Sequence, residues 1–161
     1  MDGLLPAGLN RRDADVRMDS ENSTEMHRDE IEGPMDIVGV GTHILDCPRV
    51  RKLIDRHAEK FINEVYSERE ALYCRDRTHS TEFYAAVWAA KEAVFRAIGM
   101  KWKRGISWKD VEIVCESAVD PLAVVTGNTR DRMLDRGASR VLVSFSYSRM
   151  FATATAIAVK G

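Results

Sequence analysis

The strongest constraint on the fold is the last stretch of chain, 151–159, in which every second residue is alanine. Alternation at a period of two is typical of a β-strand, because successive side chains point to opposite faces of a sheet. The residues that share one face are Ala152, Ala154, Ala156 and Ala158. Because that face carries only methyl groups, we expect a helix to pack closely against it.

The other periodicities predict a small set of helices and strands around this strand. Further strands are expected over 36–41, 111–116, 121–126 and 141–146, and helices over 49–66, 67–77, 82–98 and 128–136. Short connections favour hairpins over 111–126 and 141–159. Helices and mostly antiparallel strands in this order predict an α+β domain.

Glycine and small polar residues mark the expected ends of several elements. Gly39 and Gly41 are expected to end the first strand, and Ser80-Thr81 to cap the helix over 82–98. Gly99 is expected to stop that helix, and Gly137 to close the helix over 128–136.

Composition divides the chain into a tail and a domain. Residues 1–34 carry four basic and nine acidic side chains, a net charge of −5, with no apolar periodicity. Such a segment cannot bury enough apolar surface to offset its ordering entropy, so we expect a disordered acidic tail. Residues 35–161 carry 20 basic and 16 acidic side chains, a net charge of +4. We expect them to form a single, mildly basic domain.

The overall composition excludes several classes of protein. Hydrophobic residues make up 45% of the chain and charged residues 30%, which fits a soluble domain with a core. No apolar run is long enough for a membrane span, and the sequence has no export signal, so a cytoplasmic location is expected. The three cysteines are expected to be free thiols. A net charge of −1 predicts no general attraction to nucleic acid.

The segment 88–96 carries the first candidate chemistry. On a helix, Trp88, Glu92 and Arg96 lie one turn apart on one side. A functional interpretation makes Glu92 a metal ligand or general base, with Lys91 and Arg96 in contact with phosphates. The plain alternative is a surface Glu92–Arg96 pair worth roughly 0.2–0.5 kcal/mol. Spacing alone favours that plain alternative.

Two other segments carry weaker signals. The run 39–46 places His43 in a polar cluster beyond an apolar stretch, where sites often form. A lone histidine in such a place is more often structural than a ligand. The run 144–148 places three serines on alternate positions, where they either donate to a phosphate or form a polar hairpin surface.

Together these segments resemble a known family, the holo-acyl-carrier-protein synthases, which are small 4′-phosphopantetheinyl transferases. The resemblance covers about 36–160. It rests on the run 37–46, the helical segment Trp-Ala-Ala-Lys-Glu-Ala-Val-Phe-Arg-Ala-Ile-Gly at 88–99, the segment Gly-Ile-Ser-Trp-Lys-Asp-Val-Glu at 105–112, and Val-Ser-Phe-Ser-Tyr-Ser at 143–148.

The resemblance implies an activity and a set of partners. Such enzymes move the phosphopantetheine arm of coenzyme A onto a serine of an acyl carrier protein and release adenosine 3′,5′-bisphosphate. They use magnesium or another divalent ion such as manganese, belong to fatty acid biosynthesis, and are typically trimers with active sites between subunits. We therefore expect a homotrimer that has no partner among nucleic acids or membranes.

The resemblance also implies roles for individual residues. It makes Glu92 a metal ligand and a possible base for the attacking serine, together with Lys91 as a catalytic residue. The residues it places at coenzyme A are Lys91, Arg96, Gly99, Ser146, Tyr147 and Ser148. The residues it places at the acidic carrier protein are Arg49, Arg56 and Lys60, on a helix whose basic charge is evident from the sequence itself.

The main departure from the family pattern is His43, which stands where the family has its first metal-binding aspartate. Magnesium prefers anionic oxygen, whereas a neutral imidazole suits zinc, manganese or cobalt better. If the chain turns helical at His43, Asp46 is expected on the same side as a partial substitute. The alternatives are a non-catalytic homologue that binds coenzyme A or carrier protein, and a structural trimer partner for an active paralogue. A second departure is Tyr147, which replaces a histidine.

Overall fold

The computed structural model describes residues 34–100, 106–115 and 121–161, and residues from Pro34 onward form one compact unit. The expected acidic tail lies outside the described residues. So do two segments for which the sequence predicts a basic loop, over 101–105, and a turn, over 117–120. The part described here is an α+β domain, as the sequence predicts. None of its helices is long and apolar enough to cross a membrane.

A five-stranded antiparallel sheet forms one layer, in the spatial order β1-β5-β4-β3-β2. The strands are β1 (Asp36–Asp46), β2 (Val111–Val114), β3 (Leu122–Val125), β4 (Arg140–Tyr147) and β5 (Phe151–Lys160). The expected hairpins are confirmed, because β2 pairs with β3 and β4 pairs with β5, both antiparallel. The sheet carries β1 at one edge, beside β5.

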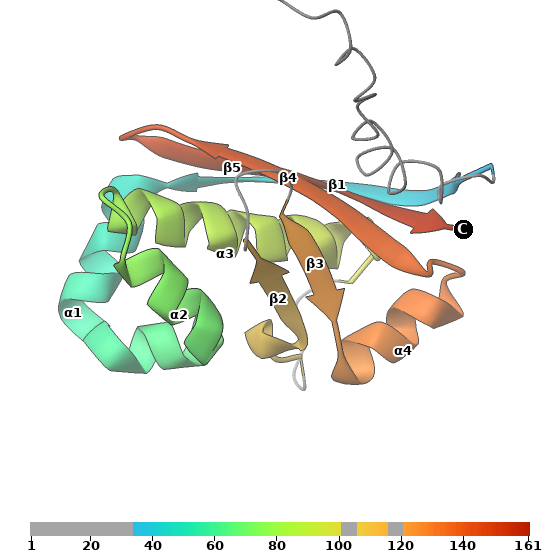
Figure 1. Ribbon diagram of the computed structural model, residues 1–161, viewed down its shortest axis with the longest axis horizontal. Helices are drawn as coiled ribbons and strands as arrows, with labels where there is room; N and C mark the ends of the chain where they lie inside the picture. The colour runs from blue at the N-terminus through green and yellow to red at the C-terminus, as the bar shows by residue number, and fades with distance from the viewer. Residues whose placement is uncertain (1–33, 101–105, 116–120) are drawn as a thin grey trace, which may run out of the picture. The chain divides into compact units, whose positions relative to one another are not determined.

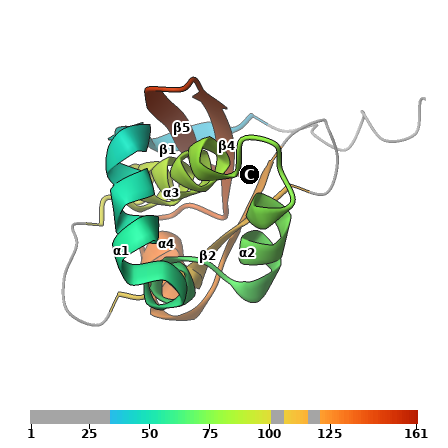
Figure 2. The ribbon, with the colours of Figure 1, turned by 90° about the vertical axis from the view of Figure 1, so that its left-hand side faces the viewer.

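Among the described residues, four α-helices and one short 3₁₀ helix accompany the sheet. They are α1 (Cys47–Val65), α2 (Glu68–Arg75), α3 (Ser80–Ala97), α4 (Gly127–Asp135) and η1 (Trp108–Asp110). Helix α3 runs beneath β1, β5 and β4, and α1 and α2 lie beside it (Figures 1 and 2). Asp110 accepts a hydrogen bond from the Thr129 hydroxyl, 2.8 Å away, and so ties η1 to α4.

The alanine face of β5 packs against α3, as expected from its sequence. All four alanines of that face are buried, and so are most residues of α3. A helix that carries apolar residues all round its axis, as α3 does, is typically buried. The other face of the sheet is covered by none of the described helices (Figure 1).

The first strand is longer than predicted, since β1 continues through both glycines to Asp46. A Cβ at Gly39 would collide with the carbonyl oxygen of Ala97, and a Cβ at Gly41 with that of Ala93. The glycines therefore do not end the strand. They let the backbone of α3 approach the backbone of β1.

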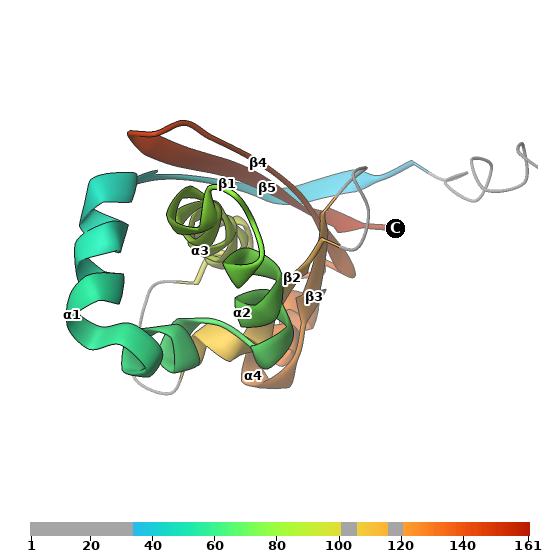
Figure 3. The ribbon, with the colours of Figure 1, turned by 60° about the vertical axis from the view of Figure 1, so that its left-hand side comes forward.

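Two helices also differ from their predicted form. Helix α1 contains a kink at Ala58, whose φ of 40° and ψ of −122° lie outside the helical region (Figure 3). Helix α3 begins at Ser80, after His79, which makes no side-chain cap. The expected cap at Ser80-Thr81 is therefore wrong, because both residues already lie inside the helix.

Candidate active site

The candidate site forms where α3 packs on β1. A Cβ at Gly41 would lie 2.8 Å from the Cβ of Arg96, so this face of β1 points at α3. His43 lies two residues further along the strand and therefore shares that face. Burial lowers the pKa of His43 below its usual value, and the positive charge of Arg96 lowers it further. The imidazole is consequently neutral near pH 7.

Arg96 fixes the helix to the strand that carries His43. Its Nη1 donates a hydrogen bond to the backbone carbonyl oxygen of Thr42, 3.0 Å away. One turn earlier on α3, burial raises the pKa of Glu92, whereas the charge of Arg96 opposes that rise. The structure therefore places both His43 and Glu92 near the guanidinium group of Arg96, a grouping that the sequence motifs alone did not require.

These residues do not make a complete metal site on their own. Within the described part of the chain, no group of three or more His, Cys, Asp and Glu side chains can hold a metal ion. The donors beside Arg96 are one carboxylate and one neutral imidazole. This pair suits manganese, cobalt or zinc better than magnesium, which prefers several anionic oxygens. A metal at this position would need further ligands from elsewhere.

Asp46 does not substitute for the missing carboxylate. The chain stays extended through His43 rather than turning helical, so residues 43 and 46 point to opposite faces of β1. Asp46 instead caps α1, and its Oδ1 accepts a hydrogen bond from the backbone N–H of Arg49 at 2.9 Å. The expectation that Asp46 shares the side of His43 is therefore wrong.

Gly99 stops α3 as the sequence predicts. Its φ of 68° is left-handed, and the N–H of Met100 donates to the Phe95 carbonyl oxygen at 2.8 Å. The N–H of Gly99 itself donates to the Arg96 carbonyl oxygen at 2.9 Å, which completes a Schellman motif. The helix stop accounts for this glycine without a ligand, and its role at coenzyme A stays a prediction.

The residues of the final hairpin do not all face α3. Val141 and Val143 of β4 are buried, so the alternating Ser146 is exposed on the opposite face. Tyr147 faces α3, and its ring lies edge-on to Phe83, with the centroids 5.9 Å apart. The hydroxyl oxygen of Ser148 accepts hydrogen bonds from the N–H groups of Met150 and Phe151, so it holds the turn.

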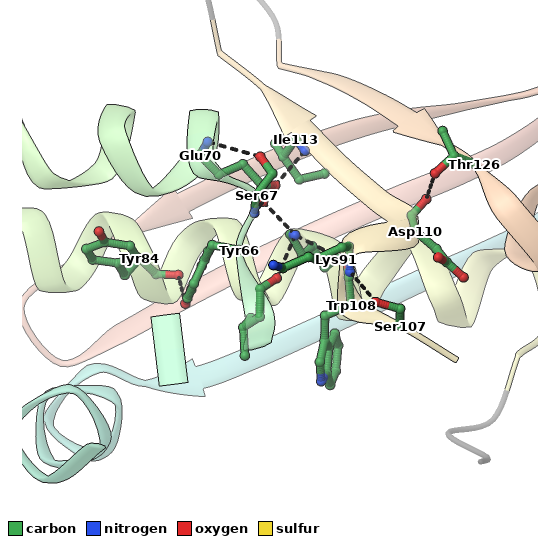
Figure 4. Close-up of polar contacts among 12 residues, drawn as sticks. Tyr66, Ser67, Glu70, Tyr84, Lys91, Ser107, Trp108, Asp110, Ile113 and Thr126 are labelled. Carbon is green, nitrogen blue, oxygen red and sulfur yellow. Dashed lines mark hydrogen bonds and ion pairs between the residues drawn. The ribbon is translucent and has the colours of Figure 1, made fainter. Parts of the chain in front are cut away.

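Lys91 lies within the core, with its side chain 0% exposed (Figure 4). Its ammonium nitrogen is 2.6 Å from Oε2 of Glu70. It also donates to the carbonyl oxygens of Val65, at 2.8 Å, and of Trp108, at 3.2 Å. An ammonium group has three N–H bonds, and these three acceptors use them all. This placement favours a structural role for Lys91 over contact with a phosphate.

Glu70 is a residue of this region that the sequence interpretation missed. Its carboxylate accepts hydrogen bonds from the backbone N–H of Ser67, at 2.8 Å, and of Ile113, at 2.7 Å. The hydroxyl oxygen of Ser67 in turn accepts from the N–H of Glu70 and completes a capping box. The spacing Ser67-x-x-Glu70 was the available signal. It predicts the cap but gives no hint of the contact with Lys91.

The three candidate carrier-protein residues are all exposed on α1. Arg49 and Arg56 are seven residues apart and share one side of its first segment. Lys60 follows the kink at Ala58 and therefore belongs to a second helical direction. The basic surface is thus bent rather than a single straight helix face.

Comparison with known proteins agrees with this fold. Residues 39–154 match the family model described as the 4′-phosphopantetheinyl transferase superfamily. A holo-[acyl-carrier-protein] synthase of Chlamydia caviae is 36% identical over 123 residues, covering 76% of this chain and 98% of that protein.

Solved structures give the same result. Holo-ACP-synthase from Plasmodium yoelii shares the fold, with a TM-score of 0.68, 23% identity, and coverage of 80% of this chain and 99% of that one. A Bacillus anthracis holo-(acyl-carrier-protein) synthase, solved in complex with CoA (3′,5′-ADP), has a TM-score of 0.63 and 27% identity, covering 80% of this chain and all of that one. The chain therefore belongs to the 4′-phosphopantetheinyl transferase superfamily, in its holo-acyl-carrier-protein synthase family.

Proposed function

We propose that this protein transfers the 4′-phosphopantetheine group of coenzyme A to a serine hydroxyl of an acyl carrier protein. The serine oxygen forms a bond to the phosphorus that carries the pantetheine arm, the pyrophosphate bond breaks, and adenosine 3′,5′-bisphosphate leaves. The observation that carries the proposal is the grouping of Glu92 and Arg96 on α3 against β1. The relatives named as holo-acyl-carrier-protein synthases support it.

Glu92 and Arg96 divide the chemistry between them. Burial raises the pKa of Glu92, which makes its carboxylate a better proton acceptor for the serine than an exposed glutamate. Arg96 is exposed and carries a permanent charge beside that carboxylate, where it can bind a coenzyme A phosphate. Because Lys91 is buried, it affects the reaction indirectly, by fixing the position of α3.

A divalent ion at this site is part of the proposal, with Glu92 and His43 as its protein ligands. Such an ion supplies positive charge to the pyrophosphate when it is bound. Because the described residues supply only two donors in this region, oxygen atoms of coenzyme A or water would have to complete the coordination. The exchange of aspartate for His43 favours manganese or cobalt over magnesium.

The exposed face of the sheet supports a homotrimer. Large apolar side chains gather there, including Val40, Ile44 and Phe151, and Ile44 is 60% exposed. Exposed apolar patches of this kind are typical of protein interfaces. Ser146 also lies on this face, whereas Glu92 lies on the side of α3. A site that uses both groups therefore needs a second copy of the chain.

The second candidate function is binding without transfer. His43 favours it, because the loss of one carboxylate removes charge that would hold a metal against a pyrophosphate. The test is to measure release of adenosine 3′,5′-bisphosphate from coenzyme A and carrier protein with magnesium, manganese and cobalt in turn. Release with at least one ion supports transfer. Tight binding of coenzyme A without release under any of them favours the second candidate.

A further inference from the structure

The Lys91–Glu70 pair joins most of the layer beside the sheet. Lys91 belongs to α3, and its three acceptors lie on the last residue of α1, on α2 and on η1. Through Ile113, Glu70 also reaches β2, which is the last strand of the sheet. One buried pair therefore links five elements (Figure 4).

The contact with Val65 is directional and falls at a helix end. The last carbonyl groups of an α-helix have no partner within the helix, and the C-terminus carries a partial negative charge. The Lys91 ammonium donates a hydrogen bond to the carbonyl oxygen of Val65 at 2.8 Å. It thereby gives this carbonyl a partner and places a positive charge at the negative end of the helix. It therefore fixes the end of α1 against α3.

Stability alone does not account for this pair. Removing two charges from water costs about as much as their attraction returns, and apolar residues of similar volume are often equally stable. Burial works against both charges, since it raises the pKa of Glu70 and lowers that of Lys91. What apolar residues cannot supply is the set of five short, directed contacts that this pair makes.

We propose that Glu70 and Lys91 are positioning residues, which hold the carrier-protein surface of α1 at a fixed place relative to Glu92. Lys91 is adjacent to Glu92 in α3. Val65 ends the second segment of α1, which carries Lys60 and continues through the kink into the segment with Arg49 and Arg56. A carrier protein bound on α1 must deliver its serine to Glu92 on α3. The pair joins these two parts of the site, and this inference rests on the proposed transfer.

The test is the double substitution Glu70→Leu with Lys91→Met, which replaces the pair by apolar side chains. We expect the thermal midpoint to stay within a few degrees of the native value. The kcat for transfer should fall about tenfold or more, the size of effect that a small misplacement of reacting groups produces. The KM for coenzyme A should stay unchanged, because neither residue touches it.

A matched control removes an exposed ion pair instead, by Arg75→Met with Asp76→Asn. These side chains are 3.6 Å apart and about 70% exposed, so transfer should not change. If the double variant of the buried pair does not fold, Glu70→Asp replaces it, since the shorter side chain keeps the charge opposite Lys91 but cannot span the contacts with both Lys91 and Ile113. The same fall in kcat is expected for it.

Three outcomes are distinguishable. A folded variant with native kcat would overturn the proposal, because the pair would then be merely structural. A raised KM for coenzyme A would also overturn it, in favour of direct contact between Lys91 and the nucleotide. If the native chain shows no transfer with magnesium, manganese or cobalt, the proposed function itself fails, before any variant is compared.

Discussion

The guanidinium group of Arg96 donates a hydrogen bond to the backbone carbonyl oxygen of Thr42, 3.0 Å away, in the strand that also carries His43. This contact joins two segments that lie 54 residues apart in the sequence. It is possible because Gly41 lets α3 approach β1 more closely than any side chain would allow. The close packing of backbone thus brings His43 to the same arginine as Glu92.

Substitution of Glu92 shows whether this residue acts in catalysis or only forms a surface pair with Arg96. We expect Glu92→Gln to lower the transfer rate by roughly 10²-fold or more, because the amide cannot accept the serine proton. Stability should change by less than about 1 kcal/mol, as for other partly exposed charges. Initial rates and thermal unfolding measure both effects. Glu82→Gln on the same helix is the control, and an unchanged rate in Glu92→Gln would exclude the catalytic role.

His43→Asp should increase transfer that depends on magnesium. The substitution restores an anionic oxygen in place of a neutral imidazole, and oxygen is the ligand that magnesium prefers. The measurement is the initial rate against magnesium concentration for both proteins. The native chain should show the weaker magnesium dependence and a relative preference for manganese or cobalt. Equal magnesium affinity and equal rates would place His43 away from the metal.

Reversal of a charge on α1 should weaken binding of the carrier protein and leave binding of coenzyme A unchanged. We expect Arg56→Glu to slow association with an acidic carrier protein and to flatten its dependence on salt, because long-range attraction is lost. Stopped-flow association at several salt concentrations tests this. Arg132→Glu, an exposed charge reversal on α4, should have little effect. Equal weakening of both ligands by Arg56→Glu would instead place α1 at the nucleotide.

A charge on the exposed face of the sheet should prevent assembly. Ile44→Glu places a carboxylate where we expect apolar contact between copies, and burying an unpaired charge there is costly. Sedimentation should show a trimer for the native chain and a monomer for the variant, with transfer lost in parallel. Leu72→Glu changes an exposed leucine of α2 and serves as the control. A native chain that sediments as a monomer would contradict the assembly.

The kink of α1 should be a site of local strain. Ala58 is exposed and has a φ of 40°, which is unfavourable for any residue with a Cβ. Relief of such strain is worth about 1–3 kcal/mol, and the extra backbone entropy that glycine loses on folding offsets part of this gain. We therefore expect Ala58→Gly to raise the free energy of unfolding by about 1 kcal/mol. Ala71→Gly in α2 should have the opposite sign, and chemical denaturation measures both. A destabilised Ala58→Gly variant would show that this conformation is not strained.

Much of the fold follows from the sequence because its signals are local. The alternating alanines of β5 predict both the strand and the helix on it, and Gly137 closes α4 with a left-handed φ of 86°, as expected. The prediction that Gly39 and Gly41 end the first strand is wrong, because a glycine that ends a strand and a glycine that lets a helix backbone approach cannot be distinguished in the sequence alone. Only the packed structure shows Ala93 and Ala97 against them.

The candidate site was less predictable for a similar reason. Lys91 and Glu92 are adjacent in the sequence, yet the helix turns Lys91 into the core and leaves Glu92 near the charge of Arg96. The partner of Lys91 is Glu70, which lies on another helix, so the spacing of charges could not pair them. The expectation for Asp46 failed because it assumed a helix where the strand continues.

The central claim is that this chain transfers phosphopantetheine and that Glu92 is needed for it. The most direct measurement is the intact mass of an apo acyl carrier protein after incubation with coenzyme A, a divalent ion and the native chain. The account predicts a gain of one phosphopantetheine group on the modified serine, and no gain when the chain carries Glu92→Gln. No gain with the native chain under magnesium, manganese or cobalt would contradict the account.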